Sequence, residues 1–480
     1  MLIEEVRSHI TQNLGHVPTA GQEKVIYALG NYLFTRDDRI FLIKGYAGTG
    51  KTSMVASLVK SLTHYRYRSV LLAPTGRAAK VLSRYSGAAA FTIHKKIYRQ
   101  KKIIEGFGEF SLDRNLHRNT LFIVDEASMI ANQSLELSVF GSGRLLDDLI
   151  TYVFSGIDCQ LILIGDDAQL PPVGFDQSDA LDPKYLQRYG FPVDEYYLDE
   201  VVRQSVDSGI LFNATKLRKK IQPDVHGFPG LITGKFPDFI SVTGENLTDM
   251  LESSYNSVGQ EETIVLCRSN KLANRYNKGI RNMILKYDED IRMGDLVMVV
   301  KNNYHWLRDS SEVDFIANGD ILEVTRVKGS KELYGFDFRD LAVRFTDYRV
   351  MEFDAKAMLD TLYSDGPALD KERTRSFFSA VSEDYQHMKG KKHKSDAIRE
   401  DPYYNALQIK FAYAITCHKA QGGQWKHVYI DQGWQTEKNL DREYYRWLYT
   451  AITRATEKVF LVNFKEEMFI DPDAYQRQGL

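Results

Sequence analysis

Cysteine is scarce in this chain, whose 480 residues include only Cys159, Cys267 and Cys417. Their wide separation excludes the paired spacing of a structural zinc site and the dense framework of a disulfide-stapled domain. We therefore expect three free thiols in a reducing compartment. The sequence also lacks a signal peptide and any apolar run long enough to span a bilayer. These absences predict a cytoplasmic protein.

Net charge is also small, at −2 by formal count. This balance excludes a uniformly basic coat protein, although local basic patches are sufficient for binding nucleic acid. Hydrophobic residues make up 43% and charged residues 26% of the chain, as in ordinary globular proteins. A chain of this length exceeds what one hydrophobic core supports, so we expect two to four domains.

The most informative segment is residues 45–52, Gly-Tyr-Ala-Gly-Thr-Gly-Lys-Thr. An apolar run at 40–43 predicts a buried parallel strand before it, and residues 53–60 predict a helix after it. A glycine loop between a strand and a helix turns backbone N–H groups towards phosphate oxygens. We expect Lys51 to reach the β- and γ-phosphates of a nucleoside triphosphate and the Thr52 hydroxyl to bind Mg²⁺. The predicted nucleotide-binding residues of this loop are Gly45, Ala47, Gly48, Thr49, Gly50, Lys51 and Thr52.

Polar side chains follow two further predicted strands. Asp125 and Glu126 end the apolar run at 120–124, and Gln169 comes shortly after the run at 160–164. In a phosphate-loop protein, the first carboxylate holds Mg²⁺ and the second is placed to orient or deprotonate the attacking water. Gln169 is a candidate sensor of the γ-phosphate, and Arg203 is a candidate stabiliser of charge in the transition state.

Residues 93–118 predict a basic β-hairpin inserted between core strands. They hold seven Lys or Arg residues against three acidic ones, and Gly106-Phe107-Gly108 forms the expected tip. At the start of this segment, His94 and Lys95 offer an imidazole and a cation to a polyanion backbone. The alternative is a solvated loop with Phe107 folded back against the protein.

The residue pattern changes twice in the second half of the chain. Short strands with turns from residue 293 to 353 predict a small antiparallel barrel. Residues 355–403 are charged, with a helical and irregular pattern. Strand-like segments return at 411–422, 428–431 and 447–455.

The order of these motifs resembles that of superfamily-one DNA helicases, and within them the RecD and Dda branch. The resemblance covers roughly residues 19–465 and includes an inserted barrel similar to the Src-homology-3 domain. It rests on Gln22, residues 45–52, Ala73-Pro74-Thr75-Gly76, Asp125-Glu126, Gly165-Asp166-Asp167-Ala168-Gln169, Lys301-Asn302-Asn303-Tyr304, Asn318-Gly319-Asp320, residues 414–422 and residues 450–455.

The resemblance implies an α/β protein with two RecA-like domains built on parallel sheets. The first domain is expected at 1–190, with the hairpin at 93–118 inserted in it. The second is expected at 191–285 and 405–480. The barrel is expected at 286–404, with its helical extension at 355–403.

The resemblance also implies ATP in the cleft between the two domains, Gln22 against the adenine, and single-stranded DNA across both domains. Arg203 and Arg454 would reach the γ-phosphate. The implied catalytic residues are Lys51, Asp125, Glu126, Gln169, Arg203 and Arg454. The implied nucleic-acid-binding residues are Pro74, Thr75, His94, Lys95, Phe107, Asn302, Thr416, His418 and Lys419.

These implications describe a DNA-stimulated ATP hydrolase that moves 5′-to-3′ on single strands and unwinds duplex DNA in replication, repair or recombination. Its expected cofactors are ATP and Mg²⁺. Its expected partners are single-stranded DNA, forked duplexes and single-strand-binding or replisome proteins, and the chain is expected to be a monomer. Two alternatives remain open, namely a translocase that displaces proteins without opening duplex, and a nucleotide-switched module that only binds nucleic acid.

Overall fold

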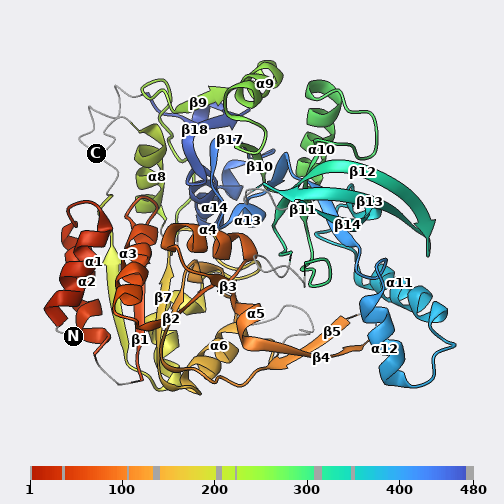
Figure 1. The fold of residues 1–480 in the computed structure, drawn as a ribbon. Helices are drawn as coiled ribbons and strands as arrows, with labels where there is room; N and C mark the ends of the chain where they lie inside the picture. The colour runs from red at the N-terminus through yellow and green to blue at the C-terminus, as the bar shows by residue number, and fades with distance from the viewer. Residues whose placement is uncertain are drawn as a thin grey trace. The chain divides into compact units, whose positions relative to one another are not determined.

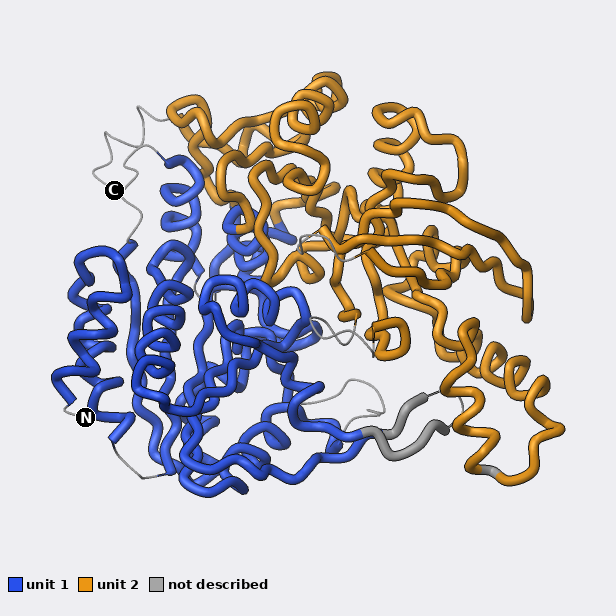
Figure 2. The backbone as a smooth tube through the Cα atoms, in the orientation of Figure 1, with its two compact units in different colours: residues 1–101, 109–227, 438–453 blue, residues 102–108, 228–437, 454–480 orange. Residues whose placement is uncertain are grey.

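The computed structural model describes residues 3–34, 38–104, 107–132, 141–201, 208–221, 224–307, 316–346 and 352–471, without the side chains of residues 100–109 and 391. The chain divides into two compact units, which Figure 2 distinguishes by colour. Unit 1 comprises residues 1–101, 109–227 and 438–453. Unit 2 comprises residues 102–108, 228–437 and 454–480.

Unit 1 is built on a six-stranded sheet in the order β3-β2-β6-β7-β1-β8, and all of its paired strands are parallel. Each central strand carries a run of four apolar residues, because both faces of the sheet are covered. Their bounds are β1 (Ile40–Gly45), β2 (Arg68–Ala73), β3 (Ala90–Thr92), β6 (Arg118–Val124), β7 (Ile157–Gly165) and β8 (Val193–Leu198).

Helices cover both faces of this sheet (Figure 1). On one face, Phe41 and Ile43 of β1 pack in a core with α1 (Ile3–Leu14), α2 (Ala20–Tyr32) and α3 (Lys51–His64). On the other face, the alternate β1 residues Ile40 and Leu42 pack in a second core. That core contains α5 (Ile93–Ile97), α6 (Leu145–Phe154), η2 (Asp179–Leu181) and α7 (Pro183–Leu186). Further helical elements of the unit are α4 (Gly76–Ser86), η1 (Ala127–Met129), η3 (Gln187–Tyr189) and α8 (Gly209–Lys220).

The basic insertion contains a two-stranded sheet, as the sequence predicted, but it does not begin as a strand. Residues 93–97 form helix α5, whose N-cap Thr92 accepts a hydrogen bond from the Lys95 N–H. The hairpin strands are β4 (Tyr98–Ile104) and β5 (Phe107–Leu112). Phe107 is the first residue of β5, and its side chain lies outside the described residues.

The first sheet extends beyond the domain boundary expected at residue 190. Strand β8 pairs with β1 from Ile40 to Gly45, and unit 1 continues to residue 227. Helix α14 (Arg442–Ile452) also belongs to this unit, where it packs against α8. The strand-like interpretation of residues 447–452 was therefore wrong. Residues 444–452 are all buried, and Arg442, Arg446 and Thr450 recur every four positions, a helical pattern that the strand interpretation overlooked.

Unit 2 contains a five-stranded parallel sheet in the order β16-β10-β17-β18-β9. Its strands are β9 (Phe239–Val242), β10 (Thr263–Cys267), β16 (Ala414–Thr416), β17 (Trp425–Asp431) and β18 (Ala455–Val462). The helical elements that accompany it are α9 (Leu247–Val258), α10 (Asn270–Gly279), η4 (Ile280–Ile284), α13 (Cys417–Ala420) and η7 (Glu466–Met468).

A closed five-stranded barrel is inserted in this sheet. Its strands are β11 (Leu296–Val299), β12 (Ile321–Leu333), β13 (Phe336–Phe345), β14 (Glu352–Met358) and β15 (Leu407–Phe411). Residues 407–411 were expected in the second RecA-like domain, but they form β15, which closes the barrel by pairing with β11 and β14. The helical extension lies between β14 and β15 and contains η5 (Leu359–Thr361), α11 (Lys371–Asp384) and α12 (Lys391–Glu400).

A buried ion pair joins the helical part of unit 2 to the start of the barrel. The Arg281 guanidinium donates from Nε and Nη2 to the two carboxylate oxygens of Asp295, at 2.9 and 3.0 Å. Both side chains are almost completely buried, at 2% and 0% exposure. Tyr413 Oη donates a further hydrogen bond to Asp295, so the buried carboxylate is satisfied.

No helix among the described residues is long and apolar enough to cross a membrane.

Candidate nucleotide site and nucleic-acid interface

The phosphate loop takes the backbone shape that its glycines allow. Gly48 and Gly50 have φ angles of 80° and 82°, in the left-handed region that side chains other than glycine rarely adopt. Gly50 is the N-cap of α3 and offers no side chain to the first-turn N–H groups. These N–H groups and the positive end of the helix dipole are therefore suited to an anion, and the binding of a nucleotide there stays a prediction.

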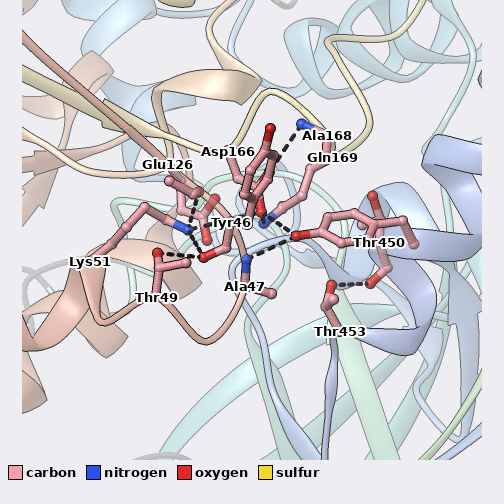
Figure 3. Close-up of polar contacts among 12 residues, drawn as sticks. Tyr46, Ala47, Thr49, Lys51, Glu126, Asp166, Ala168, Gln169, Thr450 and Thr453 are labelled. Atoms are coloured by element: carbon pink, nitrogen blue, oxygen red, sulfur yellow. Dashed lines mark hydrogen bonds and ion pairs between the residues drawn. The ribbon is translucent and has the colours of Figure 1, made fainter. Parts of the chain in front are cut away.

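Lys51 opens α3 and folds back over its own loop. Its Nζ donates to the Gly45 carbonyl oxygen at 2.6 Å. It also donates to the Tyr46 carbonyl oxygen at 2.9 Å (Figure 3). The same nitrogen lies 3.9 Å from Asp166 Oδ2. The lysine is thus held at the mouth of the glycine loop, where a bound phosphate would replace the carbonyl oxygens as its partner.

Asp125 and Glu126 follow β6, as expected. The Glu126 N–H donates to Asp125 Oδ1 at 2.8 Å, and Glu126 adopts a left-handed backbone conformation with φ of 53°. A non-glycine residue held in this region is typical of a functional site that the surrounding fold constrains. Burial, reinforced by the negative charge of Glu126, raises the pKa of Asp125 to about 7.

A divalent cation fits this chemistry. An unneutralised carboxylate at Asp125 is disfavoured by its surroundings, and Mg²⁺ prefers carboxylate and hydroxyl oxygens of the kind that Asp125 and Thr52 provide. The described residues contain no cluster of three or more His, Cys, Asp or Glu side chains that would hold a metal on their own. These two residues are therefore suited to an ion shared with a phosphate ligand, which is how Mg²⁺ is usually held.

Asp166 and Tyr449 were not among the predicted site residues, yet they connect the predicted ones. Tyr449 Oη accepts the Ala47 N–H and donates to Asp166 Oδ2, and both distances are 2.8 Å. Gln169 Nε2 donates to the same carboxylate oxygen at 3.4 Å. Helix α14 is thereby bonded to the phosphate loop and to the end of β7 within unit 1. Asp166 carried a usable sequence signal, since it directly follows an apolar strand.

Gln22 lies against the phosphate loop. Its side chain is fully buried, and its Nε2 donates to the Thr49 carbonyl at 3.1 Å. Its Oε1 accepts the Thr19 N–H, which completes the capping box of α2. In this structure Gln22 therefore positions the loop, and its contact with an adenine stays a prediction.

The expected DNA-binding residues of unit 1 lie where strands meet helices. Thr75, after Pro74 at the end of β2, caps α4 by accepting the Ala78 N–H. Burial lowers the pKa of His94 to about 4, so this imidazole is neutral at physiological pH. Lys95 Nζ lies 5.8 Å from the centre of the Phe91 ring.

In unit 2 the structure brings together predicted residues from the barrel and from the parallel sheet. Asn302 Oδ1 accepts the Asn318 N–H at 2.6 Å, and Asn318 Oδ1 accepts a hydrogen bond from Lys419 Nζ at 2.7 Å. His418 lies beside Lys419 on α13, and Thr416, the last residue of β16, is the N-cap of that helix; Thr416 and His418 are partly exposed. Burial lowers the pKa of Lys419 to about 8.

Of the two arginines predicted to be catalytic, the structure describes Arg454. Arg454 is 4% exposed within unit 2, where its Nη1 donates to the Gly423 carbonyl at 3.4 Å. Its positive charge and that of Arg268 both act on buried Cys417, so the two arginines lie in one neighbourhood. Burial is the larger effect and raises the pKa of Cys417 to about 12. Arg203 lies outside the described residues.

Two family models match the segments that carry these sites. An AAA domain matches residues 19–220, and a UvrD-like helicase C-terminal domain matches residues 411–462. The first contains the phosphate loop, Asp125, Glu126 and Gln169, and the second contains Thr416, Lys419 and Arg454. Together the two matches cover more than half of the chain. The chain belongs to the superfamily-one helicases.

Known proteins similar to this helicase differ in how much of it they share. An uncharacterized protein of Acanthamoeba polyphaga mimivirus is 24% identical over 489 residues, which cover 88% of this chain and 94% of that protein. The ATP-dependent DNA helicase dda of Enterobacteria phage T4 is 26% identical over 270 residues. That match covers 54% of this chain and 55% of dda, so this helicase spans about half the length of that relative.

A solved structure supports the fold. This is a structure of Pif1 helicases, described as the structural basis for DNA unwinding at forked dsDNA by two coordinating Pif1 helicases. The alignment covers 96% of this chain and 96% of that chain, with a TM-score of 0.50 and 16% sequence identity. The two parallel sheets and the closed barrel confirm the predicted fold class of two RecA-like domains with an inserted barrel.

Proposed function

We propose that this protein is an ATP-dependent DNA helicase that moves 5′-to-3′ on single-stranded DNA and unwinds duplex DNA. The observation that carries the proposal is the arrangement at the phosphate loop, where Lys51, Asp166 and Gln169 meet beside the paired carboxylates Asp125 and Glu126. A module that only binds nucleotide has no need of this hydrolytic set. The name of the phage relative, an ATP-dependent DNA helicase, supports the same reaction.

Each residue has a distinct task in the proposed hydrolysis. The loop N–H groups and Lys51 bind the phosphates and stabilise the charge that develops in the transition state. Glu126, held by its constrained backbone, orients or deprotonates the attacking water. Asp125 and Thr52 would hold Mg²⁺, which supplies positive charge against the phosphate oxygens when bound. Gln169 is placed to report the γ-phosphate to the rest of unit 1 through Asp166 and Tyr449.

The DNA contacts are proposed on both units. Thr75, His94 and Lys95 are the candidates in unit 1, and Asn302, Thr416, His418 and Lys419 are the candidates in unit 2. The bond from Lys419 to Asn318 supports a shared surface, because it ties the barrel to the parallel sheet at these residues. Such a surface contacts phosphate and sugar and therefore binds without sequence preference.

Unwinding assays with tailed duplexes test the proposal. We expect unwinding of a forked duplex with a 5′ single-stranded tail, and none when the only tail is 3′. Equal unwinding from 3′ tails would refute the polarity. DNA-stimulated ATPase and translocation without strand separation would leave the protein-displacing translocase as the function. An ATPase that stays near background with DNA would leave the nucleotide-switched binding module.

Two substitutions test the catalytic assignments. Lys51→Ala should reduce ATPase to near background because the phosphate charge loses its main cation. Glu126→Gln should keep ATP binding and lose turnover, since the carboxylate acts on the water. Normal ATP hydrolysis by Glu126→Gln would show that another group activates the water.

The hairpin of β4 and β5 is proposed to separate the strands of the duplex. Stacking of one base on an aromatic side chain is worth about 1–3 kcal/mol, comparable to the roughly 1.4 kcal/mol of one DNA base-pair step. Phe107→Ala should therefore reduce unwinding severalfold and leave DNA-stimulated ATPase and single-strand translocation nearly intact. Unchanged unwinding would assign Phe107 to packing, and a parallel loss of ATPase would make the hairpin part of the fold.

The proposed setting is the cytoplasm, where the chain acts as a monomer with single-strand-binding or replisome proteins. The three cysteines are free and buried, which suits a reducing compartment.

A further inference from the structure

A large polar pocket of about 620 Å³ lies within unit 1 beside the phosphate loop. It shares Tyr46, Asp166 and Gln169 with the nucleotide site. Its lining does not include Lys51, Thr52, Asp125 or Glu126, which are the residues expected to hold the nucleotide and its metal. The pocket is therefore adjacent to the nucleotide site but is lined mostly by other residues. Its volume falls in the range of ligand-binding cavities.

Three arginines of this pocket have no carboxylate partner among the described residues. Arg446 is 6% exposed and donates only to backbone carbonyls, those of Asp167 and Asp176. Its Nε and that of Arg442 are buried and make no hydrogen bond. Arg218 donates to the Asp199 carbonyl and lies 4.2 Å from the centre of the Tyr46 ring.

The acidic residues of the lining are already engaged. Glu195 forms an ion pair with Lys44 at 2.7 Å, and Asp182 caps α7 through the Lys184 N–H. Asp167 accepts a hydrogen bond from Tyr197 Oη at 2.7 Å, and Asp166 accepts those of Tyr449, Ala168 and Gln169.

Arg442 and Arg446 lie close enough to repel each other. Burial, reinforced by the positive charge of Arg442, lowers the pKa of Arg446 to about 10, and the carboxylates of Asp167, Asp176 and Asp166 offset only part of this effect. An anion between the two guanidinium groups would relieve their repulsion and supply the hydrogen bonds that their Nε atoms lack.

Two further polar atoms in the lining are buried without a partner, Ser128 Oγ and Gln169 Oε1. The Gln169 amide is oriented by its Nε2, which must face the Asp166 carboxylate, so Oε1 is the atom that lacks a donor. Ser128 follows Glu126 on the element η1. An ion that satisfies all of these groups must accept hydrogen bonds from guanidinium N–H groups and also donate one.

We propose that this pocket binds inorganic phosphate, and that the phosphate released by hydrolysis passes through it. Hydrogen phosphate has oxygens for Arg442 and Arg446 and an O–H for Gln169 Oε1. Sulfate has the same shape and charge at neutral pH but no O–H. The passage of hydrolytic phosphate rests on the proposed ATPase function, whereas the binding of free phosphate does not.

Calorimetric titration of the nucleotide-free full-length protein with inorganic phosphate, at constant ionic strength, tests the binding. We expect saturable binding that weakens about tenfold or more in Arg442→Gln, a change that removes no hydrogen bond found in this structure. Arg84→Gln, an exposed arginine of unit 1 outside the pocket, is the matched control and should bind phosphate normally. Absence of binding, or equal binding by Arg442→Gln, would overturn the proposal. Equal affinity for sulfate would overturn the assignment to phosphate.

Fluorescent ADP binding separates this pocket from the nucleotide site. Arg442→Gln should bind ADP as the unsubstituted protein does. A parallel loss of ADP and phosphate affinity would show that the pocket belongs to the nucleotide site and would overturn the proposal.

A single-turnover experiment tests whether the phosphate that enters the pocket comes from hydrolysis. Acid quenching reports cleavage of ATP, and a phosphate sensor reports free phosphate. We expect the sensor signal to lag behind cleavage, and the lag to shorten severalfold in Arg442→Gln. Identical lags in the two proteins would overturn the passage of hydrolytic phosphate. If the protein does not hydrolyse ATP, the proposed function fails, while the titration still decides the phosphate site.

Discussion

Replacing Tyr449 by phenylalanine removes one buried hydroxyl that bonds to two parts of the nucleotide site. The side chain is 1% exposed, and its hydroxyl is hydrogen-bonded to the Ala47 N–H and to the Asp166 carboxylate. Phenylalanine keeps the ring and its packing, so the substitution tests the hydrogen bonds alone. We expect the local stability of the phosphate loop to fall.

The size of the effect follows from the two bonds. A hydrogen bond to a charged group contributes about 1.5–3 kcal/mol and one to a neutral amide about 0.5–1.5 kcal/mol. Asp166 retains the donors Ala168 N–H and Gln169 Nε2, so the loss falls in the lower part of that range. We expect the free energy for local opening at Ala47 to fall by about 2–3 kcal/mol, which corresponds to roughly 30- to 150-fold faster amide exchange.

Hydrogen exchange of the full-length protein, read by mass spectrometry at single-residue resolution, measures this quantity directly. Tyr445→Phe on the same helix is the matched control. Tyr445 is equally buried, but its hydroxyl makes a single long bond of 3.3 Å to the Gly227 carbonyl. Ala47 should exchange at its usual rate in this control. An unchanged Ala47 rate in Tyr449→Phe would refute the inference that α14 holds the loop through this hydroxyl.

Two further predictions concern unit 2. Because the pKa of Lys419 is lowered to about 8, its charge is present below that pH and lost above it. We expect the affinity for single-stranded DNA, measured by fluorescence anisotropy, to fall as pH rises through about 8. Lys419→Arg should flatten this pH dependence. An unchanged pH profile in Lys419→Arg would exclude Lys419 as the source of the pH dependence. Asp295→Asn leaves Arg281 buried without its counter-ion and should cost unit 2 about 3–5 kcal/mol, measured by exchange of its core amides. Asp354→Asn, which breaks an exposed pair with Lys328, should cost less than about 1 kcal/mol, and equal costs would contradict the role of burial.

Local spacing explains which parts of the nucleotide site the sequence predicted. The phosphate loop and the pair Asp125-Glu126 are encoded within a few residues of an apolar strand, so their structure follows from the local sequence. Tyr449 meets Ala47 across about four hundred positions of chain. Its helix is buried from residue 444 to residue 452, and although polar residues recur in it at helical spacing, nothing in that local pattern indicates the contact with Ala47.

The domain boundaries were harder to predict for a related reason. Strand β8 has a partly exposed, mixed pattern because it lies at the edge of its sheet, and the sequence does not show which sheet it joins. Strand β15 is buried at every position, and its apolar residues alternate with Gln408 and Lys410, a pattern more typical of a barrel strand than of a central parallel strand. Pairing partners across long sequence separations decide both cases.

The passage from barrel to parallel sheet occurs within one peptide link. The Ala412 N–H donates to the Leu296 carbonyl at the end of the barrel, and the next residue, Tyr413, accepts the Val265 N–H of the sheet at 3.0 Å. No residue separates the two anchoring hydrogen bonds at this crossing. A displacement of the strand that ends at Thr416 would therefore strain the bond of Tyr413 and, through the adjoining residue Ala412, the wall of the barrel.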